Sequence, residues 1–360
     1  FWLTLSESTS VPSISKMTAS STCMRMLLLS NAGSLISGCI LLSRGASSGP
    51  HGYDSPMKEN MDIATDTREA SLPAEIRAKL DALVTLLRSY GPVAIGYSGG
   101  VDSTFLAAVC ARHLPAEDVL LIHLDTPLIG SPERESFERE RKRFEEMGVG
   151  VALVEVNPLA DPLVASNPAD RCYRCKLAGF SQLSSEARRR GFPTVLEGSN
   201  ADDAGDFRPG MQAVKELGAC SPLMETGWHK TEERDMLRIW GHEVWSLPAG
   251  ACLATRIPCG EEITGRKLEV VRACEDYLHE QGLRQVRVRL DRGEARVSTD
   301  ADGLEALAAM SGRATEDGEW PQGALLPTAI VEALLARGAA RVSARALPYL
   351  HGETSRQASA

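Results

Sequence analysis

One short segment near residue 100 constrains the fold more than any other part of the chain. An apolar run, Val93–Tyr97, leads directly into the six residues SGGVDS, and the periodicity of a helix follows over Ser103–Arg112. An apolar run that passes through paired glycines into a helix is typical of a buried parallel strand and its turn. The segment therefore predicts an α/β fold with this turn at the carboxyl end of a strand.

The same turn is suited to binding a phosphate or pyrophosphate. Two glycines bring successive backbone N–H groups to one ligand, and the next helix points its positive end at the same place. Two glycines alone would indicate an ordinary turn, whereas the whole segment between strand and helix favours phosphate binding. It is no Walker loop, because no Gly-Lys-Ser/Thr follows. The predicted contacts are Ser98, Gly99, Gly100, Val101, Asp102 and Ser103.

Strand and helix patterns alternate from residue 73 to about residue 200. This alternation predicts a parallel sheet with helices on both faces. The expected strands are 93–97, 119–124, 151–156 and 194–197, and the expected helices are 73–89, 103–112, 132–147 and 177–190.

The pattern changes after about residue 250 and predicts a small C-terminal α+β domain. Two alternating runs, 285–290 and 294–298, are joined by Asp291-Arg292-Gly293, which is a hairpin signal. The other expected elements are helices at 265–281, 301–310 and 327–336 and a strand at 340–345.

These patterns divide the chain into two folded domains, 73–250 and 251–350, with a polar tail at 351–360. Residues 1–72 are expected to be a disordered extension. The first 56 residues are rich in serine and nearly free of acidic side chains, and the first residue is Phe1. We interpret them as sequence from upstream of a natural start at Met57 or Met61, with a targeting peptide as the alternative.

Composition excludes some classes of function. The formal net charge of −9 argues against a nucleic-acid partner. The apolar stretch at 24–42 is interrupted by polar residues, which argues against a membrane span. Nine cysteines in a long chain do not indicate a disulfide scaffold and favour a reducing, cytoplasmic location. We also expect a homo-oligomer.

The cysteines form the second group of candidate functional residues. Cys172 and Cys175 form a C-x-x-C pair, and Cys252 stands in a later segment. The pair alone could be a redox couple, half of a zinc site or two free thiols. Three thiolates from two segments suit an iron–sulfur cluster with one iron left open, with Cys259 as an alternative ligand. Cys110, Cys220 and Cys274 are expected to be core or surface thiols.

Polar residues that follow the expected strand 194–197 form a third group. Asn200, Asp202 and Asp203 stand at the carboxyl edge where open α/β sheets bind ligands. They could bind Mg²⁺ or the nucleotide, or they could equally cap a helix. Asp206 and Arg208 could hold a substrate, or pair with each other.

A fourth group lies near and after Cys252. Arg256 could bind a phosphate or carboxylate with two hydrogen bonds. Arg287 and Arg289 alternate along one strand, and Glu275 lies on the preceding helix. These three predict an anionic-substrate or metal site, with a solvated strand and an ordinary ion pair as the alternative. Lys230 is a candidate phosphate contact or a solvated helix-start lysine.

Several of these segments together resemble a known family. SGGVDS looks like the pyrophosphate loop of the PP-loop ATP pyrophosphatases. Over about residues 74–300 the chain is similar to one member group, the LarE sulfur transferases of nickel-pincer nucleotide cofactor assembly. The stretches that carry the resemblance are RCYRCK (171–176), EGSNADD (197–203), GDFRPG (205–210), ACLATR (251–256) and RQVRVR (284–289).

The resemblance implies a reaction and its cofactors. ATP would be split between its α and β phosphates with Mg²⁺, and would adenylate a carboxylate of pyridinium-3,5-biscarboxylic acid mononucleotide, which becomes a thiocarboxylate. The family offers two sulfur sources. A lone cysteine at the Cys252 position can lose its sulfur and become dehydroalanine, or three cysteines can carry a [4Fe–4S] cluster that binds a transferable sulfide. Because Cys172, Cys175 and Cys252 are all present, the cluster is favoured. The predicted catalytic residues are these three cysteines and Asp102.

Three other functions remain open at this point. A PP-loop tRNA thiolase has similar chemistry, but the acidic balance argues against it. An amide-forming synthetase of the NAD or GMP synthetase type would need ammonia, and the sequence has no evident glutaminase domain. A nucleotide-binding iron–sulfur redox sensor would release no pyrophosphate.

Overall fold

The computed structural model describes residues 69, 72–203, 209–248, 250–312 and 322–350. All of them belong to one unit of the chain, Asn60–Ala360. The predictions for residues 1–68, for Asp206 and Arg208 and for the tail at 351–360 lie outside the described residues. The predicted boundary between residues 250 and 251 stays a prediction.

The first sheet is parallel throughout, as predicted. Its strand order is β3-β2-β1-β4, and Val93 lies opposite both Val119 and Thr194. The chain builds outward from β1 to β3 and then returns to the other side of β1. The strand order therefore reverses between β1 and β4, which is where open α/β sheets bind ligands. The strands are β1 Val93–Gly96, β2 Val119–Asp125, β3 Gly150–Glu155 and β4 Thr194–Leu196.

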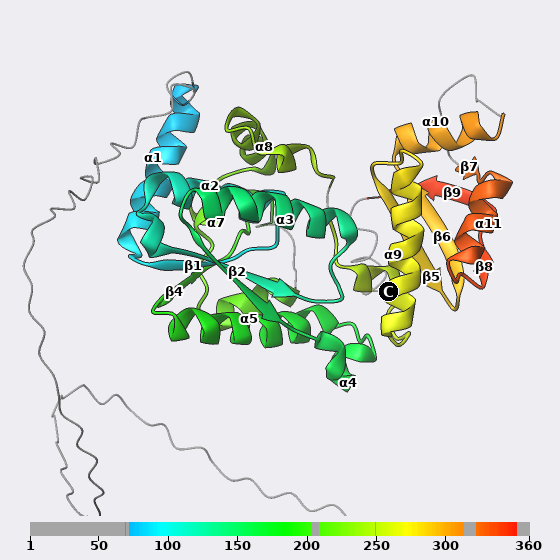
Figure 1. Cartoon of the computed structure of the whole chain (residues 1–360), viewed down its shortest axis with the longest axis horizontal. Helices are drawn as coiled ribbons and strands as arrows, with labels where there is room; N and C mark the ends of the chain where they lie inside the picture. The colour runs from blue at the N-terminus through cyan, green and yellow to red at the C-terminus, as the bar shows by residue number, and fades with distance from the viewer. Residues whose placement is uncertain (1–68, 70–71, 204–208, 249, 313–321, 351–360) are drawn as a thin grey trace, which may run out of the picture. The chain divides into compact units, whose positions relative to one another are not determined.

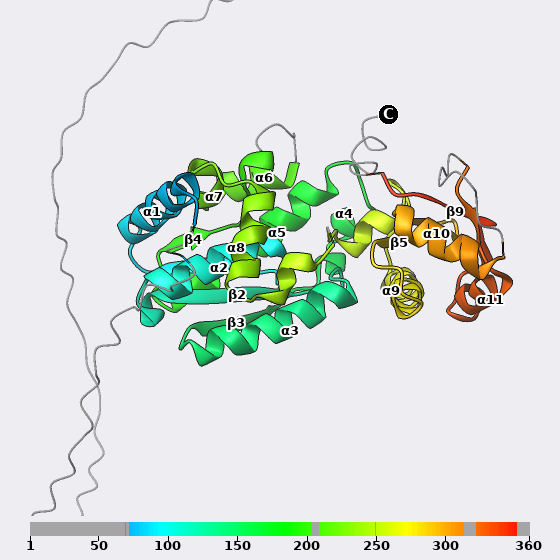
Figure 2. The same ribbon diagram turned by 90° about the horizontal axis from the view of Figure 1, so that it is seen from above.

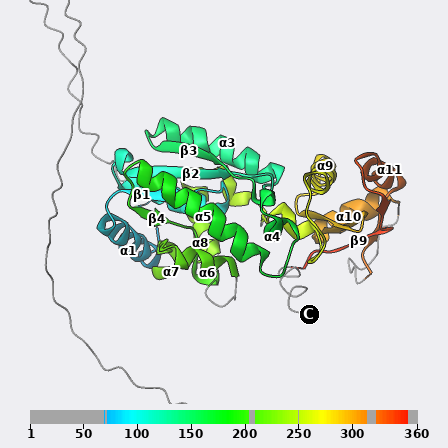
Figure 3. The same ribbon diagram turned by 90° about the horizontal axis from the view of Figure 1, so that it is seen from below.

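Helices cover both faces of this sheet (Figure 1). Right-handed crossovers place α2 and α3 on one face and α5, which leads back across to β4, on the other; Figure 3 looks onto α5. Alternate strand residues supply the two cores, since Ile95 packs with Phe105 of α2 whereas Ala94 packs with Phe180 of α5. The helices up to β4 are α1 Ala74–Ser89, α2 Val101–His113, α3 Ser131–Glu146, α4 Pro162–Ala165 and α5 Arg171–Arg189.

The segment between β4 and residue 256 is helical. The α8 helix packs against α2. Trp228 and Trp240, which flank α8 in the sequence, pack in the same core as Phe105. Its elements are α6 Pro209–Glu216, α7 Pro222–Glu225 and α8 Lys230–Ile239. Short 3-10 turns in the described part of the chain include η2 Ala116–Asp118, η3 Pro158–Ala160, η4 Ala201–Asp203, η5 Glu243–Ser246 and η6 Leu253–Arg256.

The C-terminal part is the expected α+β structure, built on a small mixed sheet (Figure 2). Its hairpin is confirmed: β5 and β6 are antiparallel, and Arg292 and Gly293 turn with φ of 47° and 80°. The strand order is β5-β6-β9-β7, and β8 also pairs with β6. The elements are α9 Gly265–Glu280, β5 Val286–Asp291, β6 Glu294–Thr299, α10 Ala301–Met310, β7 Ala324–Leu325, α11 Thr328–Ala336, β8 Arg341–Val342 and β9 Arg345–Pro348.

Two boundaries differ from the prediction in ways that matter for function. The α5 helix begins at Arg171 rather than at about residue 177, so Cys172 and Cys175 lie in its first two turns. The pattern missed this because the first turns carry few apolar residues. The α2 helix begins at Val101, two positions before the expected Ser103, so the phosphate loop runs directly into helix. None of the described helices combines the length and apolar character that crossing a bilayer requires.

Candidate functional site

The loop after β1 closes onto the start of α2. The Ser98 and Ser103 hydroxyls lie 3.0 Å apart, and the Ser98 N–H donates to the Ser103 hydroxyl over 3.2 Å. The N-cap residue of α2 is Gly100, which brings no side chain to the first N–H groups of the helix. The structure therefore places these N–H groups and the positive end of α2 together, and phosphate binding at this loop stays a prediction.

Gly99 is required where it stands. Its φ is +78°, and a Cβ at this position would lie 2.7 Å from the Cβ of Phe137 on α3. Ser136 fixes the same peptide because its hydroxyl donates to the Gly99 carbonyl over 2.8 Å. The shape of the loop is thus set by α3 as well as by its own residues.

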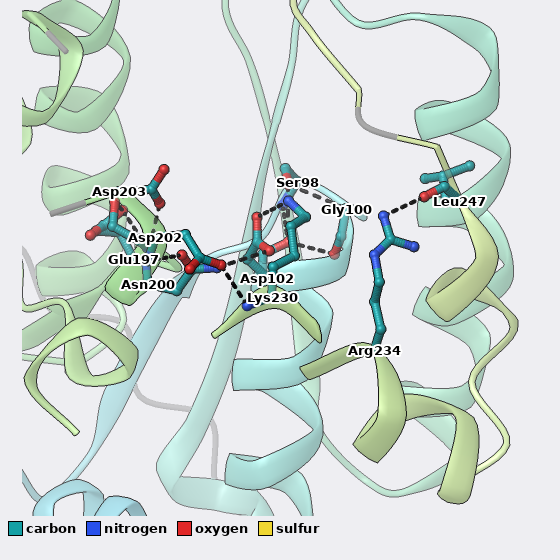
Figure 4. A network of polar contacts seen from close by, with 12 residues as sticks. Ser98, Gly100, Asp102, Glu197, Asn200, Asp202, Asp203, Lys230, Arg234 and Leu247 are labelled. Atoms are coloured by element: carbon teal, nitrogen blue, oxygen red, sulfur yellow. Dashed lines mark hydrogen bonds and ion pairs between the residues drawn. The ribbon is translucent and has the colours of Figure 1, made fainter. Parts of the chain in front are cut away.

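The turn after β4 lies against this loop, as the strand order requires. A Cβ at Gly198 would lie 3.0 Å from the Ser103 backbone nitrogen, so the two backbones are in close contact. The Asp102 carboxylate receives the Asn200 amide over 3.4 Å and the Lys230 ammonium over 3.0 Å (Figure 4). Residues from α2, the β4 turn and α8 therefore meet at Asp102.

The polar residues of the β4 turn take up capping contacts. Asn200 Oδ1 accepts from the Asp202 N–H over 3.1 Å, and Asp203 accepts from the Asn200 N–H over 3.2 Å. Asp202 accepts from the backbone N–H of Lys230 over 2.9 Å and contacts His229 Nδ1 at 2.7 Å. The hydrogen bond with His229 and then that with Lys230 lower the pKa of Asp202. The structure brings the three predicted residues together; their role toward Mg²⁺ stays a prediction.

Glu233 lies behind this cluster on α8 and is fully buried. Asp102 and Asn200 are beside it, yet neither carboxyl oxygen makes a hydrogen bond of ordinary geometry. Burial, followed by the neighbouring Asp102, raises the pKa of Glu233 to about 10. Glu233 is therefore a neutral carboxylic acid at neutral pH, placed against the charged pair of Asp102 and Lys230.

The three predicted cysteines lie in neighbouring parts of the structure, because Arg171 contacts both the Cys172 sulfur and the carbonyl of Ala254, two residues after Cys252. Cys172 and Cys252 are exposed and Cys175 is half-buried, and all are free thiols. Burial raises the pKa of Cys175 to about 11, and the charges of Cys252 and Cys172 raise it further. Electrostatic influence of this kind requires neighbouring groups. Cys110 and Cys274 are buried core thiols, and Cys220 is half-buried.

These thiols suit a cluster by chemical type, although the described residues contain no group of three or more His, Cys, Asp or Glu side chains set to hold a metal ion. The ligands of a four-iron cluster stand around an object larger than a single ion. Three neighbouring thiols, two of them exposed, match such a donor set.

Arg256 is engaged inside the protein. Its guanidinium forms a two-bond ion pair with Glu275 of α9, at 2.8 and 3.2 Å, and donates to the Cys252 carbonyl at 3.3 Å and the Thr255 hydroxyl at 2.8 Å. The bidentate partner of Arg256 in the structure is thus Glu275, and a role of Arg256 toward a substrate anion stays a prediction. Arg256 also fixes the backbone that carries Cys252.

The predicted group of Glu275 and the β5 arginines is partly joined in the structure. Glu275 accepts the Val288 N–H over 2.8 Å; burial, the larger effect, lowers the pKa of Arg287, whereas Glu275 raises it. Arg287 and Arg289 alternate with Val288, so their side chains lie on the face of β5 opposite to that of Val288. Arg287 is nearly buried, and its guanidinium lies 5.7 Å from the ring centre of Tyr349. An anion site on that face stays a prediction for the two arginines.

Comparison with known proteins identifies the family. No family model matches the chain. The pyridinium-3,5-bisthiocarboxylic acid mononucleotide synthase of Lactiplantibacillus plantarum is 30% identical over 224 residues, which are 62% of this chain and 80% of the synthase. The chain belongs to the LarE family.

Two further relatives have no described function. An uncharacterised protein of Synechocystis is 36% identical over 230 residues, which are 64% of this LarE-family chain and 84% of that protein. An uncharacterised protein of Methanocaldococcus jannaschii is 26% identical over 198 residues, with coverage of 55% and 73%.

Sequence reasoning missed three residues of this LarE-family site. Glu233 is absent from the predicted residues, because its burial beside Asp102 cannot be read from charge patterns. Asn167 and Arg171 were given no role, although Arg171 directly precedes Cys172. Their contacts join segments about 90 residues apart, which no local pattern shows.

Proposed function

We propose that this chain is an ATP-dependent sulfur transferase of nickel-pincer nucleotide cofactor synthesis. The carboxylate of pyridinium-3,5-biscarboxylic acid mononucleotide attacks the α-phosphate of ATP, which gives an acyl-adenylate and pyrophosphate. Sulfur then attacks the acyl carbon, AMP leaves, and a thiocarboxylate remains. The observation that carries the proposal is the SGGVDS loop between β1 and α2, at the point where the strand order reverses. The L. plantarum relative is named a pyridinium-3,5-bisthiocarboxylic acid mononucleotide synthase, which supports the choice of acceptor.

The loop would hold the pyrophosphate half of ATP. The open N–H groups at the start of α2 and the Lys230 ammonium offer positive charge on one side of Asp102. Lys230 and Asp102 are 38% and 29% exposed, so both are accessible to a nucleotide. Bound Mg²⁺ would offset the charge of the leaving pyrophosphate. Asp102 fits as its ligand, because its carboxylate is partly open to solvent at the loop.

Cys252 is the proposed site of sulfur transfer. The residue is exposed to solvent, but the atoms packed around its sulfur exclude enough water to raise the pKa of the thiol, while the charges of Arg171 and Arg256 lower it to a smaller extent. Without any cofactor, its thiolate would displace AMP to form a thioester, and loss of the Cys252 α-proton would break the Cβ–S bond. The products would be the thiocarboxylate and dehydroalanine.

We favour the other sulfur source, in which Cys172, Cys175 and Cys252 hold a [4Fe–4S] cluster. Three protein ligands would leave one iron open to carry a transferable sulfide. The support is that Cys172 and Cys252 lie close enough to Cys175 to raise the pKa of its thiol. Arg171 adds a positive charge beside two of them.

The test is an assay of ATP products with a panel of acceptors. Purified protein is incubated with ATP, Mg²⁺ and either the pyridinium dicarboxylate mononucleotide, a tRNA pool or nicotinate adenine dinucleotide. We expect AMP and pyrophosphate in equal amounts, and only with the first acceptor. ADP as the sole product, or dependence on tRNA, would overturn the proposal.

A further inference from the structure

Asn167 has an unusual conformation just before the cysteine-bearing helix. Its φ is +58°, and among the described residues Arg292 is the other non-glycine residue with a positive φ. Asparagine tolerates this left-handed region better than most residues. Asn167 is also 2% exposed, so its amide must find partners within the protein.

The partners of its NH₂ group all lie on the segment that follows Cys252. The Asn167 amide group lies within hydrogen-bond distance of the carbonyls of Ile257, Pro258 and Glu261, at 3.2, 2.7 and 3.2 Å. Its backbone carbonyl accepts the Gly260 N–H over 2.8 Å. One buried asparagine therefore fastens residues 257–261 to the start of the α5 region.

Arg171 continues this connection on the side nearer to the thiols. Its guanidinium donates to Asn167 Oδ1 over 2.5 Å and to the Ala254 carbonyl over 3.0 Å. The second terminal nitrogen lies 3.5 Å from the Cys172 sulfur. Arg171 is nearly buried, so each of these bonds is shielded from water.

Side chains fix the loop carrying Cys252 at two places, in addition to the backbone hydrogen bond from the Leu253 N–H to the Leu128 carbonyl over 2.9 Å. Arg256 holds the Cys252 carbonyl and is anchored on Glu275 of α9. Asn167 and Arg171 hold the backbone from Ala254 onward and are anchored at the start of α5. The α9 anchor sets the loop on its own domain core, whereas the α5 anchor sets it relative to Cys172 and Cys175.

We propose that Asn167 and Arg171 are positioning residues that hold Cys252 against the two cysteines of α5, so that the three thiols act as one site. This inference rests on the proposed function for what the thiols do. The arrangement itself is independent of ATP chemistry. Without the two residues, Cys252 remains attached to α9 but loses its fixed distance from α5.

The chain supplies a matched control for Arg171. The sequence RCYRC places one arginine directly before each α5 cysteine. Arg171 is nearly buried and bonds across to the Cys252 loop. Arg174 is 39% exposed and pairs only along its own helix with Asp170, at 2.7 Å. Arg171→Gln and Arg174→Gln therefore make the same chemical change next to equivalent thiols, with and without the connection to the loop.

The experiment measures thiol-to-thiol distance by cross-linking. Metal-free reduced protein is treated with a short bismaleimide, and peptide mass spectrometry quantifies the bridge between Cys172 and Cys252. We expect Arg171→Gln to lose most of this bridge, because a loop released from α5 samples Cys172–Cys252 separations that a short cross-linker cannot span. Arg171→Lys, which can replace one of the two bonds, should retain an intermediate yield. Arg174→Gln should match the wild type.

A second pair of variants separates positioning from folding. Asn167→Gly keeps the left-handed backbone and removes the amide, and Asn167→Asp keeps the acceptor for Arg171 but removes the donors to the loop. Both should lose the bridge while circular dichroism and a cooperative melting transition show that the variants are folded. Wild-type bridging in Arg171→Gln and Asn167→Asp, or an equal loss in Arg174→Gln, would overturn the inference. Absence of pyrophosphate release from wild-type protein would instead count against the proposed function and leave the bridging result unaffected.

Discussion

Asp102 is the residue on which three parts of the chain converge. It lies at the start of α2, receives the Asn200 amide from the β4 turn and forms an ion pair with Lys230 of α8. Because the Asp102 carboxylate is already held in place by these contacts, little rearrangement of the protein is needed when a nucleotide and Mg²⁺ bind. Its carboxylate is therefore expected to contribute to adenylation through charge rather than through shape.

The first prediction follows from that charge. Asp102→Asn keeps the size of the side chain and removes its charge, so pyrophosphate release should fall by about 100-fold, which is typical of losing one charge-stabilising group. The melting temperature should change little, because the residue is partly exposed. Asp81→Asn, an exposed change on α1, serves as the control. Wild-type pyrophosphate release in Asp102→Asn would exclude the role given to this carboxylate.

Glu233 gives a prediction for the dependence of stability on pH. Its pKa is raised from 4.5 to about 10 in the folded state, so the folded protein holds a proton that the unfolded chain releases. The contribution is complete below pH 4.5 and is lost as the pH rises toward 10. Within this window each pH unit lowers the free energy of unfolding by about 1.4 kcal/mol.

Glu233→Gln should remove this dependence. Urea denaturation of both proteins at pH 6, 7, 8 and 9 measures the difference in free energy of unfolding, and taking the difference cancels the titration of the thiols. The variant should be more stable than the wild type by an amount that grows with pH. A constant difference across the series would show that Glu233 titrates normally in the folded protein.

Single residues differ in how well the sequence foretold them. Ser98 and Ser103 could be predicted because the loop residues are contiguous and their chemistry is local. The roles of Asn167 and Glu233 depend on burial and on partners from distant segments. Arg256 is a third case. Its ability to bind a carboxylate with two hydrogen bonds could be predicted, but the sequence does not show that Glu275 of α9 lies beside it.

At the scale of elements, the phosphate loop depends on α3 as much as on β1 and α2. A Cβ at Gly99 would lie 2.7 Å from the Phe137 Cβ and nearly as close to the Phe137 backbone, at a φ of +78°. The collision could be relieved only by moving the backbone of α3 or of the loop, and both are held by hydrogen bonds. A Cβ at Gly100 would meet only the Ser98 hydroxyl oxygen, at 3.4 Å, which is an ordinary contact.

The two glycines should therefore respond differently to alanine. Gly99→Ala is expected to lower the free energy of unfolding by at least about 2 kcal/mol, from the left-handed conformation and the collision together. Gly100→Ala, at a φ of −83°, should cost less than about 1 kcal/mol. Urea denaturation monitored by circular dichroism measures both. Equal losses in the two variants would mean that α3 does not define the loop.

The elements themselves were predictable in proportion to the strength of their periodicity. The four parallel strands are apolar runs between long helices, and their order follows from right-handed crossovers once the direction of growth reverses. The start of α5 was placed too late because its first turns carry cysteine, tyrosine and arginine. The joining of β9 with β6 and β7 could not be foreseen, because β7 and β8 have two residues each.

At the scale of the whole molecule, the open question is where the transferred sulfur originates. A cluster held by Cys172, Cys175 and Cys252 predicts brown anaerobically reconstituted protein with about four irons per chain. Cys172→Ala, Cys175→Ala and Cys252→Ala should each lose iron and transfer together, because three ligands are the fewest that hold the cluster with one iron open. Cys110→Ala, in the core of the parallel sheet, is the control. With added sulfide the wild type should turn over repeatedly.

The sacrificial route predicts a different pattern from the same samples. Cys252→Ala alone would abolish transfer, because Cys172 and Cys175 would only shape the surroundings of the reacting thiol. Turnover would stop at one sulfur per chain, and mass spectrometry would find residue 252 as dehydroalanine. Oxygen can strip a cluster and leave free thiols, so both measurements belong on anaerobic protein. Dehydroalanine at position 252 with no iron bound would rule out the cluster and leave the sulfur transferase in place, since both routes end in the same thiocarboxylate.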